Sequence, residues 1–477
     1  MKARIFADEN RKWWTLGALS FALFMIMLDN TVVNVALPSI QRDLGIGLTE
    51  LEWTVNAYAL TFAVLMLSGG KLADFFGRRR IFLLGLVIFT LSSLACGLAT
   101  TGEMLIGART VQGVGAALML PATLSIISAT FPPHQRGMAI GIWAGVSAMA
   151  LAIGPLIGGL ITEHIDWSWI FFVNVPIGVA GVVVGRLVIR ESRDTSADQR
   201  LDIPGLLVSA VALFSLTFAL IEANSYGWTD PVIVGLFALS AVSFVGFVLL
   251  ERHQRSPMLD LSLFRSSTFA GANVVALLVT LAMFGVFFFM SIYMQNVLGY
   301  SATKTGAAFL PMTILIILIA PIAGKSSDRI GSRALMTAGM LCLSASLVLF
   351  SRLGLDSTFW DIFPGLVIGG FGMALVMTPM TAAALGSVPV EKSGVGSGVL
   401  NTFRQVGGAL GIAVMGAIVA SYVDLEGGRL DPSGFMDGFQ VALRVSAVFA
   451  LIGAVVALTT IRKHRHMDAG ELAEAAA

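Results

Sequence analysis

The chain has 477 residues, of which 56% are hydrophobic and only 12% are charged, with a net charge of +1. Soluble domains carry about 25% charged residues, so this composition excludes an ordinary soluble enzyme and indicates that most of the surface faces lipid. Net charge alone argues neither for nor against nucleic-acid binding. The two cysteines and five histidines show no metal-ligand or disulfide pattern.

Fourteen apolar runs are long enough to cross a membrane, because a membrane helix needs about 20 mostly apolar residues. They fall at 13–37, 51–70, 81–99, 103–127, 137–161, 168–190, 202–222, 230–250, 268–297, 303–324, 334–353, 359–385, 395–421 and 438–462. The first run is too long for a secretory signal, so we expect it to be retained as a span. The sequence therefore predicts an all-α polytopic membrane protein with 14 transmembrane helices.

The positions of the basic residues orient these spans. With both termini in the cytoplasm, most of the 30 Lys and Arg residues fall in cytoplasmic segments. Those that then fall outside are few: Arg42, Lys304, Arg352 and Arg429. Because cytoplasmic loops carry an excess of Lys and Arg, we expect a multi-pass protein of the bacterial cytoplasmic (inner) membrane with both termini inside.

Asp29 is the most informative polar residue of the first span. It lies about eight residues, or about 12 Å, before the outer end of that helix, where a carboxylate is costly unless it is paired, hydrated or protonated. Such an acid can hold either a proton or a cationic substrate. Asn34 on the same span is grouped with it as a coupling or substrate residue. The alternative is a structural acid that bridges helices.

The loop after the second span carries glycines, an acid and arginines at close spacing. Gly70 and Gly77 permit a sharp turn, Asp74 is expected to accept backbone N–H bonds at a helix start, and Arg78 is expected to face anionic lipid or a neighbouring carboxylate. A plain topology anchor explains the arginines about as well, but explains the glycine–aspartate spacing poorly.

Arg109 lies about six residues, or about 9 Å, inside the outer end of the fourth span. Its depth is thus similar to that of Asp29. Gln112 follows three residues later, shares the face of the arginine, and extends a polar strip along this helix.

The fifth span is rich in small residues. Gly145, Gly154, Pro155, Gly158 and Gly159 lie along it. Glycines four residues apart let helices approach closely, and a proline bends the helix. We interpret this stretch as a tight, bendable contact between two halves of a moving protein, although close packing alone would also require the glycines.

An internal repeat divides the chain. Gly70, Asp74 and Gly77 recur in the same order and spacing as Gly324, Asp328 and Gly331. Both copies fall on the predicted cytoplasmic side, so the repeat is parallel. The predicted domains are an N-terminal six-helix bundle, an inserted helix pair, a C-terminal six-helix bundle and a cytoplasmic tail, at 13–190, 202–250, 268–462 and 463–477.

With these motifs the chain resembles the major facilitator superfamily, and specifically its fourteen-helix drug:proton antiporter branch. The likeness covers nearly the whole chain and is carried by 28–38, 70–80, 109–121 and 145–159. The stretch ending Gly154-Pro155-Leu156-Ile157-Gly158-Gly159 is typical of the exporters of this family, and generally not of its importers. The resemblance implies two pseudo-symmetric six-helix bundles.

The resemblance also implies roles for single residues. In this family the first and fourth helices border the central cavity, so we expect a switchable Asp29–Arg109 pair that responds to protonation, with a purely structural pair as the alternative. The loop that contains Asp74 would latch the halves in one conformation. Phe284, Phe287, Phe288 and Met294 would line the cavity as an apolar wall, unless they face lipid or packing partners. Asn401 and Arg404 are placed at the same cavity.

The sequence and the resemblance together favour a proton-coupled secondary active exporter of small lipophilic, perhaps cationic, compounds, working by alternating access. The alternative is an importer or symporter, or an exporter of one metabolite. A membrane enzyme is disfavoured because no His, Cys or carboxylate cluster occurs at one depth. We expect a small-molecule substrate, protons and membrane lipids as partners, with no nucleic acid, obligate protein partner, metal or cofactor.

Overall fold

The computed structural model describes residues 8–193, 202–254, 257, 259–388, 393–423 and 432–462, and every regular element in these ranges is helical. The first half holds α2 (Asp8–Leu44), α3 (Leu48–Phe76), α4 (Arg78–Gly97), α5 (Gly102–Thr130), α6 (Pro133–His164), α7 (Trp169–Phe172) and α8 (Asn174–Val188). The middle holds α9 (Ile203–Tyr226) and α10 (Pro231–His253). The second half holds η1 (Leu261–Arg265), α11 (Ser267–Ile292), η2 (Tyr293–Val297), α12 (Ala302–Ala308), α13 (Leu310–Ile330), α14 (Ser332–Phe350), α15 (Phe359–Gly386), α16 (Ser393–Ala420) and α17 (Pro432–Thr460).

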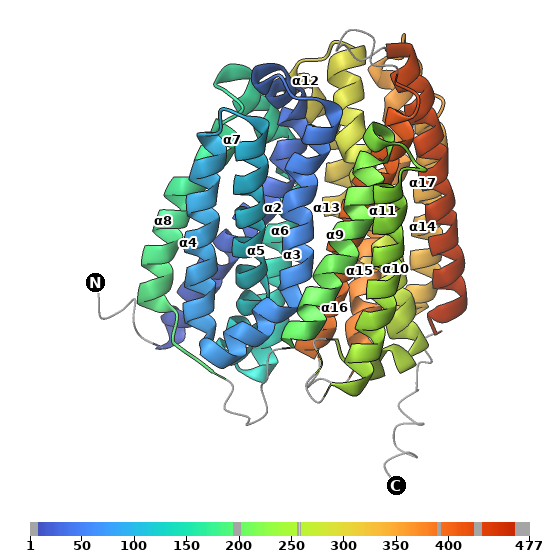
Figure 1. Cartoon of the computed structure of the whole chain (residues 1–477). Helices are drawn as coiled ribbons and strands as arrows, with labels where there is room; N and C mark the ends of the chain where they lie inside the picture. The colour runs from blue at the N-terminus through green and yellow to red at the C-terminus, as the bar shows by residue number, and fades with distance from the viewer. Residues whose placement is uncertain are drawn as a thin grey trace.

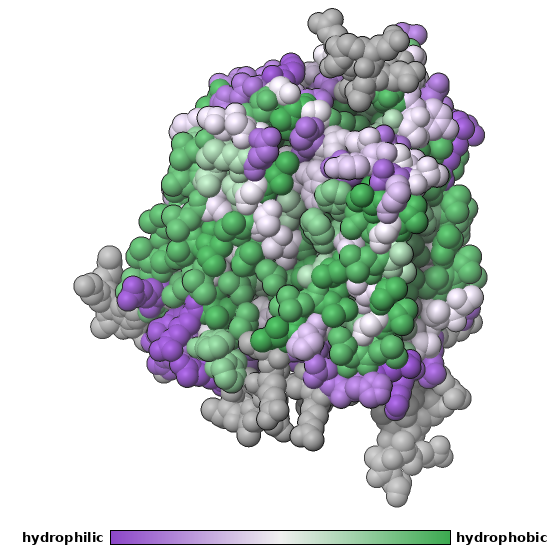
Figure 2. Space-filling model, in the orientation of Figure 1, coloured by the Kyte–Doolittle hydropathy of each residue, from purple (hydrophilic) through white to green (hydrophobic). Residues whose placement is uncertain are grey.

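The surface has the pattern of a membrane protein. In Figure 2 hydrophobic side chains cover most of the middle of the visible face, and hydrophilic ones gather at its two ends. Within the described residues, 13 helices are long and apolar enough to cross a membrane. The remaining predicted span corresponds to α6, a helix of 32 residues. The chain is therefore an integral, multi-pass, all-α membrane protein.

The long helices run up and down through two side-by-side groups (Figure 1). Helices α2 to α8 form the first bundle and α11 to α17 form the second, while α9 packs against α3 of the first bundle and α16 of the second. The start of α2 and the end of α17 lie at the same end of the molecule. The domain boundaries drawn from the sequence stay predictions, and the predicted tail 463–477 lies outside the described residues.

Two predicted spans are interrupted helices. The run 168–190 divides into α7 and α8, and the run 303–324 divides into α12 and α13. A proline follows each break, Pro176 in the first turn of α8 and Pro311 in the first turn of α13. Proline has no N–H to continue the backbone ladder into the preceding turn, which explains both interruptions.

The two bundles meet tightly at one end of the molecule, which we call the closed end. There the Gln295 side chain donates to Val35 O at 2.8 Å, and the Thr303 amide donates to a Glu163 carboxylate oxygen at 2.8 Å. A side chain at Gly159 of α6 would overlap the backbone of α12. At the other end of α6, an added Cβ at 141 or 145 would have no described atom within 4 Å. These glycines of α6 therefore approach the second bundle only toward the closed end, whereas α3 and α16 remain in contact further along, where Leu67 lies against Gly398.

Candidate functional site

Asp29 of α2 and Arg109 of α5 form a buried ion pair. Arg109 Nη1 lies 2.5 Å from Asp29 Oδ2, and the exposed fractions of the two side chains are 0% for Asp29 and 1% for Arg109. The two charges are at the same depth, as the sequence predicts, because α2 and α5 run in opposite directions and each places its residue part-way from the closed end. An unpaired charge here would be costly, so each residue lowers the free-energy cost of burying the other.

A ring of amides and a hydroxyl completes the site. Gln112 accepts from Arg109 Nη1 at 2.7 Å and donates its Nε2 hydrogens to Asp29 Oδ1 at 3.0 Å and to Ser93 Oγ at 2.7 Å. Asn174 Nδ2 donates to Asp29 Oδ1 at 3.4 Å and to Ser93 Oγ at 3.1 Å. The carboxylate of Asp29 thus faces one guanidinium and two amide donors, which stabilise its charged form by hydrogen bonding.

Arg109 is fixed by further contacts on its other side. Its Nε donates to Thr54 O of α3 at 3.2 Å. The guanidinium lies over the Tyr58 ring at 4.2 Å and near the Phe171 ring at 5.8 Å, distances that allow cation–π attraction. Four helices, α2, α3, α5 and α7, therefore contact this one cation.

Several members of this network were not predicted from the sequence. Ser93, Asn174, Tyr58 and Thr54 lie within apolar runs, and only their polarity marks them there. Asn174 was the most detectable, because an amide inside a membrane span needs a partner. Asn34, by contrast, donates to Asn30 O within its own helix and not to the ion pair. Its role in coupling stays a prediction.

The predicted conformational loop joins α3 to α4. Gly77 ends α3 with φ at +111°, and its repeat partner Gly331 ends α13 with φ at +86°, so both positions need glycine. The expected role of Asp74 at a helix start is wrong. Asp74 lies in the last turn of α3 and accepts from Arg78 Nε at 2.8 Å, because α3 continues to Phe76 and the turn comes after it.

Glu191 is the acid that faces this loop, and the sequence did not single it out. Its Oε1 accepts from the Arg79 amide at 3.1 Å, and its Oε2 lies 3.8 Å from Arg79 Nε and 3.7 Å from Arg80 Nε. The Arg78 amide donates to Ser192 O at 3.0 Å. The loop is thus held to the segment after α8. Gly70 lies against Pro121 of α5.

The glycines of α6 make close contacts on two sides. Gly154 and Gly158 lie against Thr31 and Val32 of α2, within the first bundle. Gly159 lies against the backbone of Ala302 in α12, in the second bundle, and the carbonyl of Pro155 approaches Gly306 of α12. Gly145 has no described neighbour within 4 Å of an added Cβ. The glycine contacts of α6 with the second bundle therefore lie in its closed-end half.

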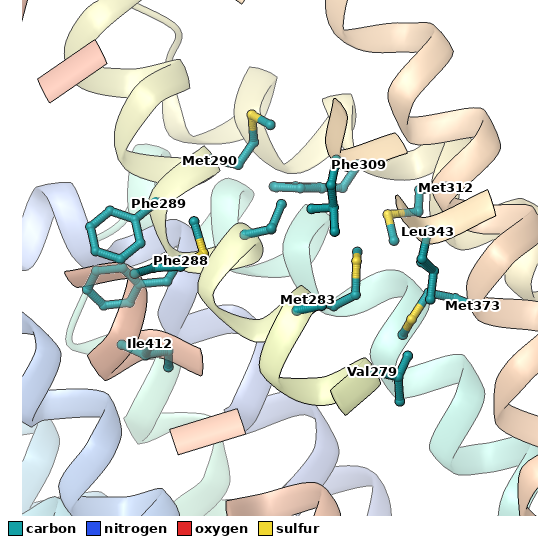
Figure 3. Close-up of a cluster of buried hydrophobic side chains, with 14 of the residues drawn as sticks. Val279, Met283, Phe288, Phe289, Met290, Phe309, Met312, Leu343, Met373 and Ile412 are labelled. Carbon is teal, nitrogen blue, oxygen red and sulfur yellow. The ribbon is translucent and has the colours of Figure 1, made fainter. Parts of the chain in front are cut away.

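The aromatic residues of α11 lie mostly in packing. Figure 3 shows Phe288 and Phe289 beside one another in an apolar cluster with Met283 and Ile412. Phe288 and Met294 are 0% exposed. Phe287 packs on Phe309 at 5.3 Å, and Phe284 lies against Gly408 of α16. Of the four, only Phe284 and Phe287 are partly exposed, so a cavity wall made of all four residues stays a prediction.

Arg404 of α16 donates from Nη2 to Thr381 Oγ1 of α15 at 2.9 Å. Its Nε is buried and has no partner in the described part of the chain. Asn401 donates to Ser397 O within α16. The sequence did not predict the threonine partner, because a hydroxyl within an apolar span resembles many others.

No group of three or more His, Cys, Asp or Glu residues within the described ranges has the arrangement of a metal site. A polar cavity of about 340 Å³ lies at the closed end, lined by residues that include Arg42, Glu163 and Gln295. Neither member of the Asp29–Arg109 pair lines it.

The chain is similar over most of its length to known proteins. The profile of the Major Facilitator Superfamily matches residues 19–412. The chain is 35% identical to the Tetracenomycin C resistance and export protein of Streptomyces glaucescens, over 95% of this chain and 92% of that one. It is 38% identical to the multidrug resistance protein Stp of Mycobacterium tuberculosis, over 86% of this chain and 76% of that one.

A puromycin resistance protein of Streptomyces alboniger is 37% identical, over 95% of this chain and 91% of its own length. Among solved structures, the inward-facing, unoccupied bacterial homologue of the human lysosomal transporter Spinster has a TM-score of 0.66 at 17% identity. It covers 95% of this chain and 97% of that one. This likeness concerns the fold alone.

Proposed function

Because the chain belongs to the major facilitator superfamily, within its drug-efflux branch, we propose that it is a proton-driven exporter of small lipophilic compounds, cationic ones included. It is a transporter and not an enzyme. The relatives named for export or resistance support the direction of transport. The observation that carries proton coupling is the buried Asp29–Arg109 pair, the one place in the described first bundle where two opposite charges are fully enclosed.

The pair gives antiport a physical basis. While Asp29 is ionised, it holds Arg109 at the junction of α2, α3 and α5. A proton on Asp29 removes the attraction and leaves the guanidinium without its counter-ion, so protonation and pairing exclude one another. A cationic cargo near Asp29 competes with both. Proton uptake and cargo release are thereby linked at one carboxylate.

The predicted conformational elements suit alternating access. The closed-end half of α6 and α12 meet through glycine and backbone, so small rotations of one bundle against the other can break and remake the contact without displacing side chains. At the opposite end, Asp74 pairs with Arg78 across the α3–α4 turn. The Arg79 and Arg78 amides hold this turn to Glu191 and Ser192, in the segment after α8. We assign these two ends the roles of gate and latch.

The orientation is part of the proposal. The two described chain ends lie at the end of the molecule away from the gate, and the excess of Lys and Arg favours the cytoplasm for that side. We therefore place the closed end outside the cell, both termini in the cytoplasm and the protein in the bacterial plasma membrane, with protons, substrate and lipid as its only partners.

The test uses inverted membrane vesicles, in which the outer face points inward. Ethidium uptake into the vesicles should depend on an acidic lumen, and an uncoupler should abolish it. Asp29→Asn should remove the dependence on the proton gradient, and Arg109→Ala should strongly reduce uptake. Asp166→Asn, at an exposed acid that bonds only Ser168, is the matched control and should transport normally. Wild-type uptake that does not depend on the proton gradient would refute proton coupling and leave facilitated diffusion as the transport mechanism.

A further inference from the structure

A second buried acid lies in the seam where α3 of the first bundle meets α16 of the second. Glu52 is in the second turn of α3 and is only 2% exposed. Its Oε2 atom has no hydrogen-bond partner among the described residues. An ionised carboxylate without a partner is strongly disfavoured away from water. The carboxyl group is therefore neutral, and so protonated, in this closed seam.

Gly416 of α16 makes room for this carboxyl group. An added Cβ at 416 would overlap both oxygens of Glu52, so the carboxyl group lies directly against the glycine. Glu52 is near the start of α3 and Gly416 is near the end of α16, which places their contact at the closed end. The same two helices touch again where Leu67 lies against Gly398, about 22 Å further along α3. The seam can therefore part at the closed end while this second contact holds.

A third helix supplies another acid. Glu222 of α9 accepts from Trp53 Nε1 at 3.0 Å and lies close enough to act electrostatically on Glu52. Two neighbouring carboxylates disfavour simultaneous ionisation. Asn224 of α9 donates to Ala417 O of α16 at 2.7 Å. The inserted helix α9 thus bonds both sides of the seam and closes it over Glu52.

The other charged groups on helices packed against α3 are paired, exposed or distant. Asp29 of α2 and Arg109 of α5 pair with one another, and Arg404 of α16 is 12 positions, or about 18 Å, before Gly416. The charges that share the closed end are exposed: Arg42 and Asp43 of α2, Glu50 of α3 and Glu103 of α5. The others lie at the opposite ends of their helices: Arg11 and Lys12 of α2, Lys71 and Asp74 of α3, Arg78, Arg79 and Arg80 of α4, and Asp202 of α9. Among the described side chains Glu52 therefore has no cation to hold it ionised.

We propose that Glu52 is an external proton sensor of the gate, which lets the seam close only while its carboxyl group holds a proton. Parting of α3 and α16 at the closed end exposes the group to outside water, where a glutamate ionises at neutral pH. Closing the seam removes that water, so the group must first regain a proton from the same side. No proton crosses the membrane at this site. This inference rests on the alternating access proposed above and leaves the number of protons exchanged at Asp29 unchanged.

The direction of the pH effect follows from this difference in bound protons. The closed gate holds one proton more than the open gate, so raising the external pH favours the open gate and lowering it favours the closed gate. A difference of one bound proton changes the ratio of the two conformations about tenfold per pH unit. An alkaline outside, which offers no proton gradient to drive export, should thus hold the gate open and stop the cycle.

A pair of spin labels across the seam measures this ratio. Thr49→Cys on α3 and Ser421→Cys just beyond the end of α16 carry the labels in a Cys342→Ala background, while Cys96 is buried and stays in place. Double electron–electron resonance on the purified protein should show a short and a long distance between the labels. The logarithm of the long-to-short ratio should rise with pH more steeply in wild type than in Glu52→Gln, by about one per pH unit.

Two variants separate loss of the acid from damage to the seam. Glu52→Asp keeps a carboxyl group and should keep the steep pH dependence. Glu50→Gln, at the exposed acid two positions earlier, is the matched control and should behave as wild type. Equal pH dependence in wild type and Glu52→Gln, including distances that never change with pH, would overturn the assignment. Ethidium uptake that does not depend on the proton gradient, alongside the expected difference in slope, would contradict proton-driven export and leave the sensor standing.

Infrared spectroscopy tests the protonation state itself. Wild-type protein at mildly acidic pH, where the labels report a closed seam, should show the C=O stretch of a protonated carboxyl group in the difference spectrum against Glu52→Gln. Gly416→Ala, whose Cβ would overlap the carboxyl group, should shift this band and move the label distances toward the open gate. A difference spectrum without the band would show that Glu52 is ionised in the closed seam, and would refute the proposal.

Discussion

The Asp29–Arg109 pair predicts an unequal response to removing either partner. Asp29→Asn leaves Arg109 without a counter-ion, and the new amide presents donors toward Arg109 Nη1 or Gln112 Nε2, which are themselves donors. Arginine cannot give up its proton. Removing one member of a buried pair in this way costs about 3–5 kcal/mol of stability.

Arg109→Gln should cost less. Asp29 then keeps the Gln112 and Asn174 amides as donors, at 3.0 and 3.4 Å, and it can also bind a proton to become neutral. We expect a loss of about 1–3 kcal/mol, the usual penalty for a buried polar group that loses one partner. The double variant leaves no unpaired charge, so its loss should be smaller than the sum of the single losses by about 1–3 kcal/mol.

The assay is equilibrium unfolding of the purified protein in mixed micelles, as a double-mutant cycle with Asp166→Asn as the control for removing an acid. A coupling energy near zero, or a larger loss for Arg109→Gln than for Asp29→Asn, would refute the reasoning. Either result would mean that the charges are stabilised by something other than each other.

Two further predictions concern glycines. Gly159→Val should separate α6 from α12, since even a Cβ at 159 would overlap the Ala302 carbonyl. A cysteine introduced as Thr162→Cys, at the nearby cavity, should then react several-fold faster with a membrane-impermeant maleimide. The control Gly145→Val, in open space, should leave this reaction rate unchanged. Gly77→Ala should lower the free energy of unfolding by about 1–3 kcal/mol, because φ is +111° and the new Cβ would lie 2.7 Å from Glu191 Oε1. Gly107→Ala, with nothing within 4 Å of the new Cβ, should be neutral or stabilising in the same unfolding assay.

The sequence was sufficient for the parts of the structure that depend on position along a helix. Apolar length gives the spans, and counting residues from the span ends places Asp29 and Arg109 at one depth. The rotation of each helix about its axis and the identity of its neighbours cannot be obtained by counting residues. Ser93 and Asn174 join the network because α4 and α8 turn those faces toward α2 and α5, and no count of residues reveals this.

Acids near span ends were harder to interpret. Glu222 lies near the end of α9, and a long side chain near a helix end can extend to water. In the structure it is partly buried and accepts from Trp53 of α3. Glu52 drew no attention for the same reason, and only the packing of α9 and α16 over it shows that it is enclosed. The inserted pair of helices therefore changes the surroundings of the first bundle as well as lengthening the chain.

One backbone contact connects the two acids physically. Arg109 Nε donates to the carbonyl of Thr54, two residues after Glu52 on α3. A displacement of this part of α3 that uncovers Glu52 must stretch that bond, and so loosens the position of Arg109 over Asp29. Conversely, a proton on Asp29 weakens the hold of Arg109 on α2 and leaves α3 freer to move. Protonation of Asp29 is therefore expected to act, through Arg109 and α3, on the seam that encloses Glu52.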